Sequence, residues 1–191
     1  MTVVALIRHM PTAWNDAGRL QGTADTPLGA AADWQLPPEL AGFCVLSSPL
    51  RRAMETAGYL GVAAPAIDPR LGEMDWGTWE GRTLAELRCR HGAAMAALEA
   101  RGLDFRPPGG ESPRDVQARV APLLGEIAAT GRPVAAITHK GVIRAVLALA
   151  TGWDMRGKPP ARLSWSAAHL FRLDAAGRPA VERLNLALER R

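Results

Sequence analysis

Two stretches of the sequence place a histidine at the end of an apolar run. Residues 3–10 read VVALIRHM, in which the apolar run leads directly into Arg8 and His9. Residues 134–140 read VAAITHK and end in the same way at His139. A neutral imidazole can act as a nucleophile, and its reference pKa near ~6.5 keeps much of it neutral at pH 7. Both histidines are therefore candidates for catalysis.

Other polar residues fall close to the ends of the same elements. Arg52 lies in the first turn of an expected helix, and Asn15 and Glu73 lie in expected loops. Guanidinium groups match phosphate oxygens in a bidentate way, so this set favours a pocket for a phosphate dianion. The sequence has no Walker loop, no carboxylate cluster for magnesium and no His-Glu-x-x-His zinc motif. Phosphoryl transfer without a metal needs a protein nucleophile, fixed cations and an acid for the leaving oxygen.

The elements that position these residues alternate between strands and helices. Continuous aliphatic runs indicate buried strands, while caps and apolar spacing indicate helices. The expected strands are residues 3–9, 43–47 and 132–139, and two more around a turn at Ala176-Gly177. The expected helices are 50–60 with Ser48 as its cap, 84–101 after a capping box of Thr83 and Glu86, 113–129 and 141–150. Residues 11–42 are expected to form a long loop with at most a short helix.

This alternation predicts an α/β fold, a three-layer sandwich with a mostly parallel central sheet flanked by helices. We expect one domain over residues 1–191. In such sheets, ligands bind beyond the carboxyl ends of the strands. If the strands at 3–9 and 132–139 are neighbours, His9 and His139 face one pocket.

Composition excludes several classes of function. The apolar fraction is 48% and the net charge +4, with arginines scattered rather than clustered, which argues against a nucleic-acid partner. No window approaches the ~20 apolar residues of a membrane span, and no secretion signal is found, so a cytoplasmic protein is expected. Cys44 and Cys89 are interpreted as free buried thiols. A monomer and a homodimer both remain open.

Five blocks of the sequence, in this order, resemble the signatures of the histidine phosphatase superfamily, which includes the cofactor-dependent phosphoglycerate mutases. The resemblance covers roughly residues 2–150. The blocks are RHMPTAWNDAGRLQG (8–22), SSPLRRAMETA (47–57), LGEMDWGTWEG (71–81), PGGES (108–112) and THKGVIRAVL (138–147).

The resemblance implies a phosphoglycerate mutase-like fold, no cofactor and no metal, and a role for each matching residue. His9 would be the nucleophile that becomes phosphohistidine, and Glu73, rather than Asp75 or Glu80, the general acid and later the base. The residues implied to bind the phosphoryl group are Arg8, Asn15, Arg52 and His139. Those implied to contact the rest of the substrate are Gln21 and Gly22. The tryptophans Trp14, Trp76 and Trp79 are interpreted as packing residues, and His91 and His169 as structural.

Two positions depart from the family pattern. Met10 and Lys140 stand where the family usually has glycine after each histidine. Met10 precedes Pro11, which favours an extended backbone with negative φ, so we expect its side chain at the pocket wall. Lys140 opens a helix, where the dipole disfavours a cation by ~0.3–1 kcal/mol. We therefore expect Lys140 to contact the phosphate or a second acidic group of the substrate.

The resulting hypothesis is a metal-independent phosphomonoesterase that hydrolyses a small phosphorylated metabolite. A phosphoglycerate-type mutase and a non-catalytic phosphate sensor are the alternatives, and a phosphohistidine-protein phosphatase is disfavoured because the block at 71–81 is present. That block resembles both α-ribazole phosphatases and broad sugar-phosphate phosphatases, so the particular ester stays open.

Overall fold

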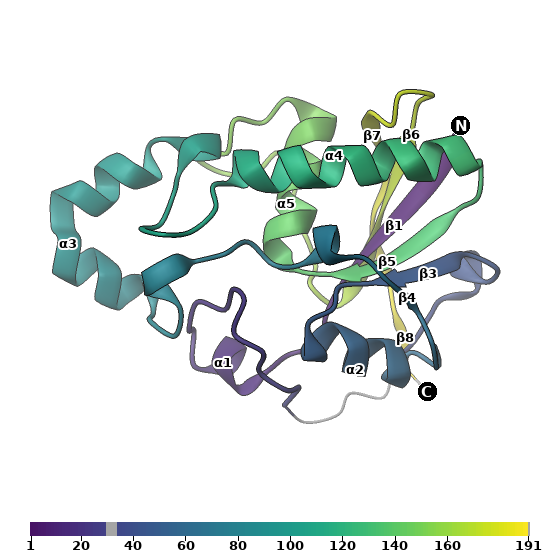
Figure 1. The fold of residues 1–191 in the computed structure, drawn as a ribbon, viewed down its shortest axis with the longest axis horizontal. Coiled ribbons are helices and arrows are strands. Elements are labelled where there is room, and N and C mark those ends of the chain that lie inside the picture. Colours follow the sequence, from purple (N-terminus) through teal and green to yellow (C-terminus); the bar gives the residue numbers. More distant parts are fainter. Residues whose placement is uncertain (30–33, 191) are drawn as a thin grey trace.

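The computed structural model describes residues 1–29 and 34–190, and its centre is a mixed sheet (Figure 1). Six strands follow the order β4-β3-β5-β1-β6-β7. Their bounds are Ala66–Ile67 (β4), Cys44–Ser47 (β3), Val134–Thr138 (β5), Thr2–Arg8 (β1), Ala167–Leu173 (β6) and Pro179–Ala187 (β7). The first four run parallel, and the last two form an antiparallel hairpin against β1. A separate pair joins β2 (Trp34–Gln35) to β8 (Glu189–Arg190).

The pairing of β1 with β5 decides where the functional edge lies. The two strands are parallel neighbours, with Arg8 opposite Thr138. The backbone N–H of His9 donates to the carbonyl of Thr138 at 2.9 Å, just past the end of β1. His9 and His139 therefore leave the sheet side by side, as the sequence predicts.

Helices cover both faces of the sheet, which confirms the expected layers. α4 (Pro113–Thr130) and α5 (Lys140–Thr151) lie on one face, and α2 (Arg51–Tyr59) lies on the other (Figure 1). Side chains alternate between these faces along β1: Val4 and Leu6 pack in the core with α4 and α5, whereas Ala5 and Ile7 pack in the core with α2. Burial on both faces explains why the strand is a continuous apolar run.

Shorter elements and one long helix complete the chain. α1 (Ala13–Asp16) is a single turn, and α3 (Leu84–Glu99) projects away from the sheet (Figure 1). Short 3₁₀ turns occupy Pro38–Leu40, Pro69–Leu71, Gly77–Trp79 and Gly102–Asp104. The capping box of Thr83 and Glu86 opens α3 as expected.

α3 is not the uninterrupted helix that the sequence predicts. Gly92 adopts φ 47° and ψ −121°, which breaks the helix into two arms. This backbone region is open to glycine and strained for side chains with a Cβ. Leu87 and Met95, one on each arm, are buried in a small cluster with Trp79. The break lets both arms cover the same apolar surface.

Two further expectations are wrong. Ser48 is not the N-cap of α2: the N-cap is Leu50, whose apolar side chain makes no cap bond. The Ser48 hydroxyl accepts from the N–H of Leu50 at 3.3 Å, ahead of the helix, and also contacts His139. Cys44 is half-buried and Cys89 exposed, rather than both buried, because Cys89 lies on the outer surface of α3. Part of the expected loop at 11–42, residues 30–33, falls outside the described residues.

Candidate active site

The two histidines lie against each other at the edge of the sheet. The ring centroids of His9 and His139 are 5.0 Å apart, with 52° between the ring planes. His9 is 3% exposed and His139 is completely buried. The parallel pairing of β1 and β5 produces this contact between residues 130 positions apart in the chain.

The hydrogen bond of His9 fixes its tautomer. Nδ1 lies 2.7 Å from the carbonyl oxygen of Met10. A carbonyl oxygen accepts only, so Nδ1 carries the proton and Nε2 keeps its lone pair. Burial, with help from the charges of Arg8 and Arg52, lowers the pKa of His9 to about 3. The ring is therefore neutral at pH 7 and presents a free nitrogen.

His139 is held by a residue that follows the neighbouring strand, β3. Its Nε2 lies 2.7 Å from the hydroxyl of Ser48, at the end of β3. Burial, followed by the charges of His9 and Arg52, holds the pKa of His139 well below its usual value. Its other ring nitrogen, Nδ1, is buried and has no hydrogen-bond partner among the described residues.

Arg8 and Arg52 bring positive charge to the histidines. Arg52, in the first turn of α2, is completely buried and donates to the carbonyls of Gly22 and Ala24, both at 2.8 Å. Its neighbour Arg51 is exposed and pairs with Glu55, as expected for a surface residue. Across the described residues, the buried side-chain nitrogen and oxygen atoms without a partner are Arg8 Nε, Arg52 Nε and His139 Nδ1.

Glu73 is the carboxylate of its block that reaches the histidines' cavity. Its Oε1 accepts from the backbone N–H of Met74 at 2.8 Å and of Gly141, at the start of α5, at 3.0 Å. A side chain at Gly141 would collide with this carboxylate. Burial raises the pKa of Glu73, although Arg52 and these N–H groups oppose the shift. Glu73 therefore stays protonated to a higher pH than an ordinary glutamic acid does.

The other two carboxylates considered for the acid have structural partners. Asp75 accepts from the backbone N–H of Gly77 at 2.7 Å. Glu80 accepts from the backbone N–H groups of Thr23 and Ala24, at 2.6 Å and 2.9 Å. Both stabilise loops, and neither lines the cavity that His9 and Glu73 share.

A clamp that the sequence reasoning missed holds the segment before Glu73. Arg119 of α4 donates to the carbonyls of Gly72 and Glu73 at 2.9 Å and 3.2 Å, and also to that of Arg70. Its Nε donates to Glu111 at 2.9 Å, and Glu111 accepts from the N–H of Asp75. Glu111 lies inside the quoted block at 108–112, but nothing in the sequence pairs it with Arg119.

A polar network connects Asn15 and Gln21 to the loop after β1. Asn15 Oδ1 accepts from the backbone N–H of Thr12 at 3.1 Å, and Asn15 Nδ2 donates to Gln21 Oε1 at 3.3 Å. Thr12 Oγ1 also donates to Gln21 Oε1, at 3.1 Å. The capping box of Thr12 and Asn15 forms α1 and fixes the direction of the Asn15 amide.

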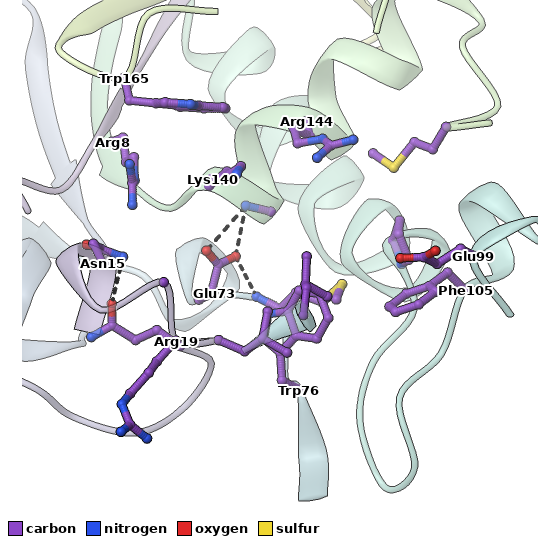
Figure 2. Close-up of a pocket in the computed structure, with 18 of the residues that line it drawn as sticks. Arg8, Asn15, Arg19, Glu73, Trp76, Glu99, Phe105, Lys140, Arg144 and Trp165 are labelled. Atoms are coloured by element: carbon purple, nitrogen blue, oxygen red, sulfur yellow. Dashed lines mark hydrogen bonds between the residues drawn. The ribbon is translucent and has the colours of Figure 1, made fainter. Parts of the chain in front are cut away.

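These residues surround a cavity of about 780 Å³ (Figure 2). The predicted site residues that line it are Arg8, His9, Asn15, Gln21, Glu73 and Lys140. Arg52, Gly22 and the fully buried His139 lie behind this lining. Trp76, interpreted as a packing residue, also lines the cavity, while Trp79 and Trp14 do not. Arg144 and Trp165 line it as well and were not singled out from the sequence.

Met10 does not form part of the cavity wall, contrary to expectation. Its side chain is 4% exposed and packs in the core between the sheet and α2. Its φ is negative, as the following proline predicts. The backbone N–H of Met10 donates to Thr56 Oγ1 at 2.9 Å, which turns the side chain away from the site.

Of the remaining histidines, His169 has the surroundings of a structural residue, whereas His91 is exposed on α3. His169 is buried, lies 3.1 Å from the carbonyl of Ser164 and accepts from the N–H of Asn185. His91 stacks on Trp79 at 6.0 Å between centroids. Within the described residues, no group of three His, Cys, Asp or Glu side chains suits a metal ion. None of the described helices has the length and apolar character that a membrane crossing requires.

Comparison with known proteins identifies the family. A family model described as the histidine phosphatase superfamily (branch 1) matches residues 4–186. The chain belongs to the histidine phosphatase superfamily. This confirms the resemblance of the five blocks, and the match extends past residue 150 through the hairpin of β6 and β7.

Two curated relatives represent the two activities under consideration. Glucosyl-3-phosphoglycerate phosphatase of Mycolicibacterium vanbaalenii is 35% identical over 176 residues, covering 82% of this chain and 77% of that protein. A 2,3-bisphosphoglycerate-dependent phosphoglycerate mutase of Methylobacterium radiotolerans is 31% identical over 192 residues, covering 91% and 90%.

Solved structures show the same fold. Mycobacterial glucosyl-3-phosphoglycerate phosphatase in complex with VO3 superposes with a TM-score of 0.79 at 26% identity, covering 98% of this chain and all of that one. A structure from Thermus thermophilus gives 0.68 at 32% identity, with 98% and 100% coverage. Together these findings support a histidine-phosphatase enzyme acting on a small phosphorylated metabolite, with a mutase as the alternative.

Proposed function

We propose that this histidine phosphatase hydrolyses a phosphomonoester without a metal, through a phosphohistidine at Nε2 of His9. The observation that carries the proposal is the set of three buried nitrogens without partners among the described residues: Arg8 Nε, Arg52 Nε and His139 Nδ1. Buried polar atoms are almost always hydrogen-bonded, and a dianion with several acceptor oxygens would satisfy all three. The neutral ring of His9 lies against that of His139, and the charges of Arg8 and Arg52 are close enough to lower its pKa.

Each neighbour of His9 has a role in holding the phosphoryl group. Arg8, Arg52, His139 and the amide of Asn15 would bind its oxygens while charge develops on them. Fixed donors of this kind act strongly because the histidines and Arg52 are excluded from water. Gln21 and Gly22 act indirectly: their oxygens accept hydrogen bonds from Asn15 and Arg52 and so orient these two side chains.

The reaction takes two steps that share Glu73. In the first, the Nε2 lone pair of His9 attacks phosphorus, the ester P–O bond breaks, and the Glu73 carboxyl proton passes to the departing oxygen. In the second, water attacks the phosphohistidine, the Glu73 carboxylate takes its proton, and the P–N bond breaks. Neutral His9 and protonated Glu73 are then restored, with phosphate released.

The substrate is a small organic phosphate in the cytoplasm, and neither nucleic acid nor membrane is a partner. The names of the glucosyl-3-phosphoglycerate phosphatase relatives support phosphorylated sugar and glycerate derivatives as the first candidates. The single domain acts as a monomer or a homodimer.

A trapping experiment tests the proposal. We expect brief incubation with ³²P-labelled p-nitrophenyl phosphate in EDTA to label the protein with an acid-labile phosphohistidine that decays as phosphate appears. His9→Ala should abolish labelling and turnover, whereas His91→Ala, which removes an imidazole outside the cavity, should retain both. Turnover that EDTA abolishes, or a His9→Ala protein that still turns over, would contradict the proposal.

A mutase is the second candidate because of the similarity to the Methylobacterium radiotolerans enzyme. A mutase would return the phosphoryl group to a second hydroxyl of the sugar or glycerate instead of to water. Phosphorus NMR of the products distinguishes the two, since hydrolysis gives inorganic phosphate and a mutase gives an isomeric ester. A phosphate sensor would bind the label without forming phosphohistidine.

A further inference from the structure

Lys140 and Arg144 form one wall of the cavity. They lie four positions apart on the first turns of α5 and both line the cavity (Figure 2). The ammonium of Lys140 lies 5.4 Å from the ring centroid of Trp165, and the guanidinium of Arg8 lies 5.6 Å from the same centroid. Within the described residues, neither Lys140 nor Arg144 makes a salt bridge.

Two other arginines that line the cavity, Arg88 and Arg19, are already bound to acceptors. Arg88 pairs with Glu99 at 2.7 Å, and Arg19 donates to the carbonyl of Gly81 at 2.7 Å. Lys140 and Arg144 instead contact aromatic faces, Trp165 and Trp153 respectively. Such contacts leave the hydrogen-bond donors at the end of each side chain free for an anion.

The position of these two cations opposes the stability of their helix. Like charges four positions apart on a helix repel each other, and a cation in the first turn opposes the helix dipole. Partial burial further lowers the pKa of both groups. An anion from outside the chain would relieve all three effects.

The charges around the cavity leave room for a second anion. Arg8 and Arg52 already match a phosphate dianion at His9. Glu73 is the acidic group next to the histidines, and it must be protonated when the reaction begins. Lys140 and Arg144 therefore remain uncompensated when the phosphate is bound.

We propose that Lys140 and Arg144 bind a carboxylate of the substrate that is separate from the phosphate ester. This deepens, and depends on, the phosphatase function proposed above. The four-residue separation spans about 6 Å along the helix, so the two side chains can hold one carboxylate between them. On the remaining wall, Trp76, Phe105 and Met155 provide an apolar surface for the rest of the molecule. The preferred substrates are thus acidic phosphomonoesters rather than neutral sugar phosphates.

A matched pair of substrates tests the inference. 3-Phosphoglycerate and glycerol 3-phosphate differ in one group, a carboxylate in the first and a hydroxymethyl in the second. We expect the wild type to have the higher kcat/KM for 3-phosphoglycerate. Lys140→Gln and Arg144→Gln should each reduce this preference by about tenfold, and the double variant by up to about a hundredfold, as expected for charge-assisted hydrogen bonds.

Two control variants separate a specific contact from a change in net charge or folding. Arg132→Gln removes one positive charge just before the amino end of β5, at the opposite end of that strand from His139, and should leave the preference unchanged. Arg144→Lys retains the charge and should retain most of the preference. Thermal unfolding of each variant establishes that the protein compared is folded.

The outcomes distinguish this inference from the proposed function. A wild type that hydrolyses neither ester and forms no phosphohistidine from p-nitrophenyl phosphate would overturn the phosphatase function, and the subsite with it. A wild type that turns over p-nitrophenyl phosphate but neither ester would overturn the subsite alone. A wild type that hydrolyses both esters without preference would overturn the subsite alone. Lys140→Gln and Arg144→Gln variants that lose equal activity on both esters would also overturn it, because these cations would then be binding the phosphate.

Discussion

The inner site and the outer rim of the cavity are built in opposite ways. The inner site consists of His9, His139, Arg52 and Glu73, and its two histidines and Arg52 are almost fully buried. The outer rim consists of Arg88, Glu99 and Phe105, contributed by α3 and the segment after it. Inner residues are fixed by backbone groups of several elements, whereas the charged rim residues pair with each other across the break in α3.

This difference separates the residues that carry out the reaction from those at the entrance of the cavity. Inner groups have shifted pKa values and unsatisfied donors because the surrounding backbone prevents them from pairing among themselves. Such conditions destabilise a fold and are typical of sites that bind charge. The charged residues of the rim are largely exposed and paired with each other, so substituting them should change activity and stability little. Substitutions should therefore have effects that decrease steadily from the inner site outward.

Among substitutions that keep the His9 nucleophile, the largest effect is expected for Glu73→Gln, which keeps the shape of the side chain but removes its proton. Hydrolysis of glycerol 3-phosphate should fall by about 10²–10⁴-fold, because its alkoxide leaving group needs general acid catalysis. With p-nitrophenyl phosphate the fall in the phosphohistidine-forming step should be much smaller, since p-nitrophenolate leaves as a stable anion. Single-turnover kinetics of both esters measure this difference.

The pH dependence of the same step sharpens the assignment. Activity of the wild type on glycerol 3-phosphate should fall as pH rises through the raised pKa of Glu73, which places the optimum in the mildly acidic to neutral range. Glu73→Gln should lack this decline. Equal losses on both esters with an unchanged pH profile would show that Glu73 is not the acid.

Gly141→Ala is expected to have the next largest effect. The φ of Gly141 is one that alanine can adopt, but the added methyl group would collide with the Glu73 carboxylate. We expect hydrolysis of glycerol 3-phosphate to fall by about 10- to 100-fold, with the same dependence on the leaving group as Glu73→Gln. Gly58→Ala in α2 is the matched control, because nothing lies within 4 Å of its added methyl group. Comparable losses for the two alanine variants would contradict this explanation.

The sequence could predict the inner site because short patterns encode its position. Unbroken apolar runs identify β1 and β5, and their parallel pairing brings His9 and His139 together. The cap at Thr83 lies within a few residues of the groups it binds, so it is visible locally.

What the sequence could not predict depends on contacts between distant segments. Ser48 has the pattern of a helix cap, but its hydroxyl bonds to His139, 91 residues away. Arg119 and Glu111 are ordinary helix and loop charges until α4 packs against the segment before Glu73. The helical spacing around Gly92 resembles that of a continuous helix, because a glycine inside such a pattern does not reveal its own φ.

A third test concerns stability rather than rate. The pKa of His9 is lowered to about 3 in the folded protein, whereas an unfolded histidine titrates near ~6.5. Between these values the unfolded chain binds the extra proton, so the free energy of unfolding decreases as pH falls below about 6.5. His9→Gln should reduce this slope by up to about 1.4 kcal/mol per pH unit. Urea unfolding at pH 6.5, 5.5 and 4.5 measures it, and identical slopes would contradict the buried neutral state.

The smallest effect is expected at the outer rim. The Arg88 and Glu99 side chains are 60% and 34% exposed, so solvent screens their attraction. Arg88→Gln should change the free energy of unfolding by less than about 1 kcal/mol, as is usual for surface ion pairs. Arg119→Gln is the comparison, since its side chain is 22% exposed and also binds the carbonyls before Met74. Losing those contacts leaves half-buried carbonyl acceptors unpaired, so Arg119→Gln should cost more stability and also reduce the Glu73-dependent step. If Arg88→Gln proves the more damaging of the two, the cavity is not organised from a fixed inner site toward an adaptable rim.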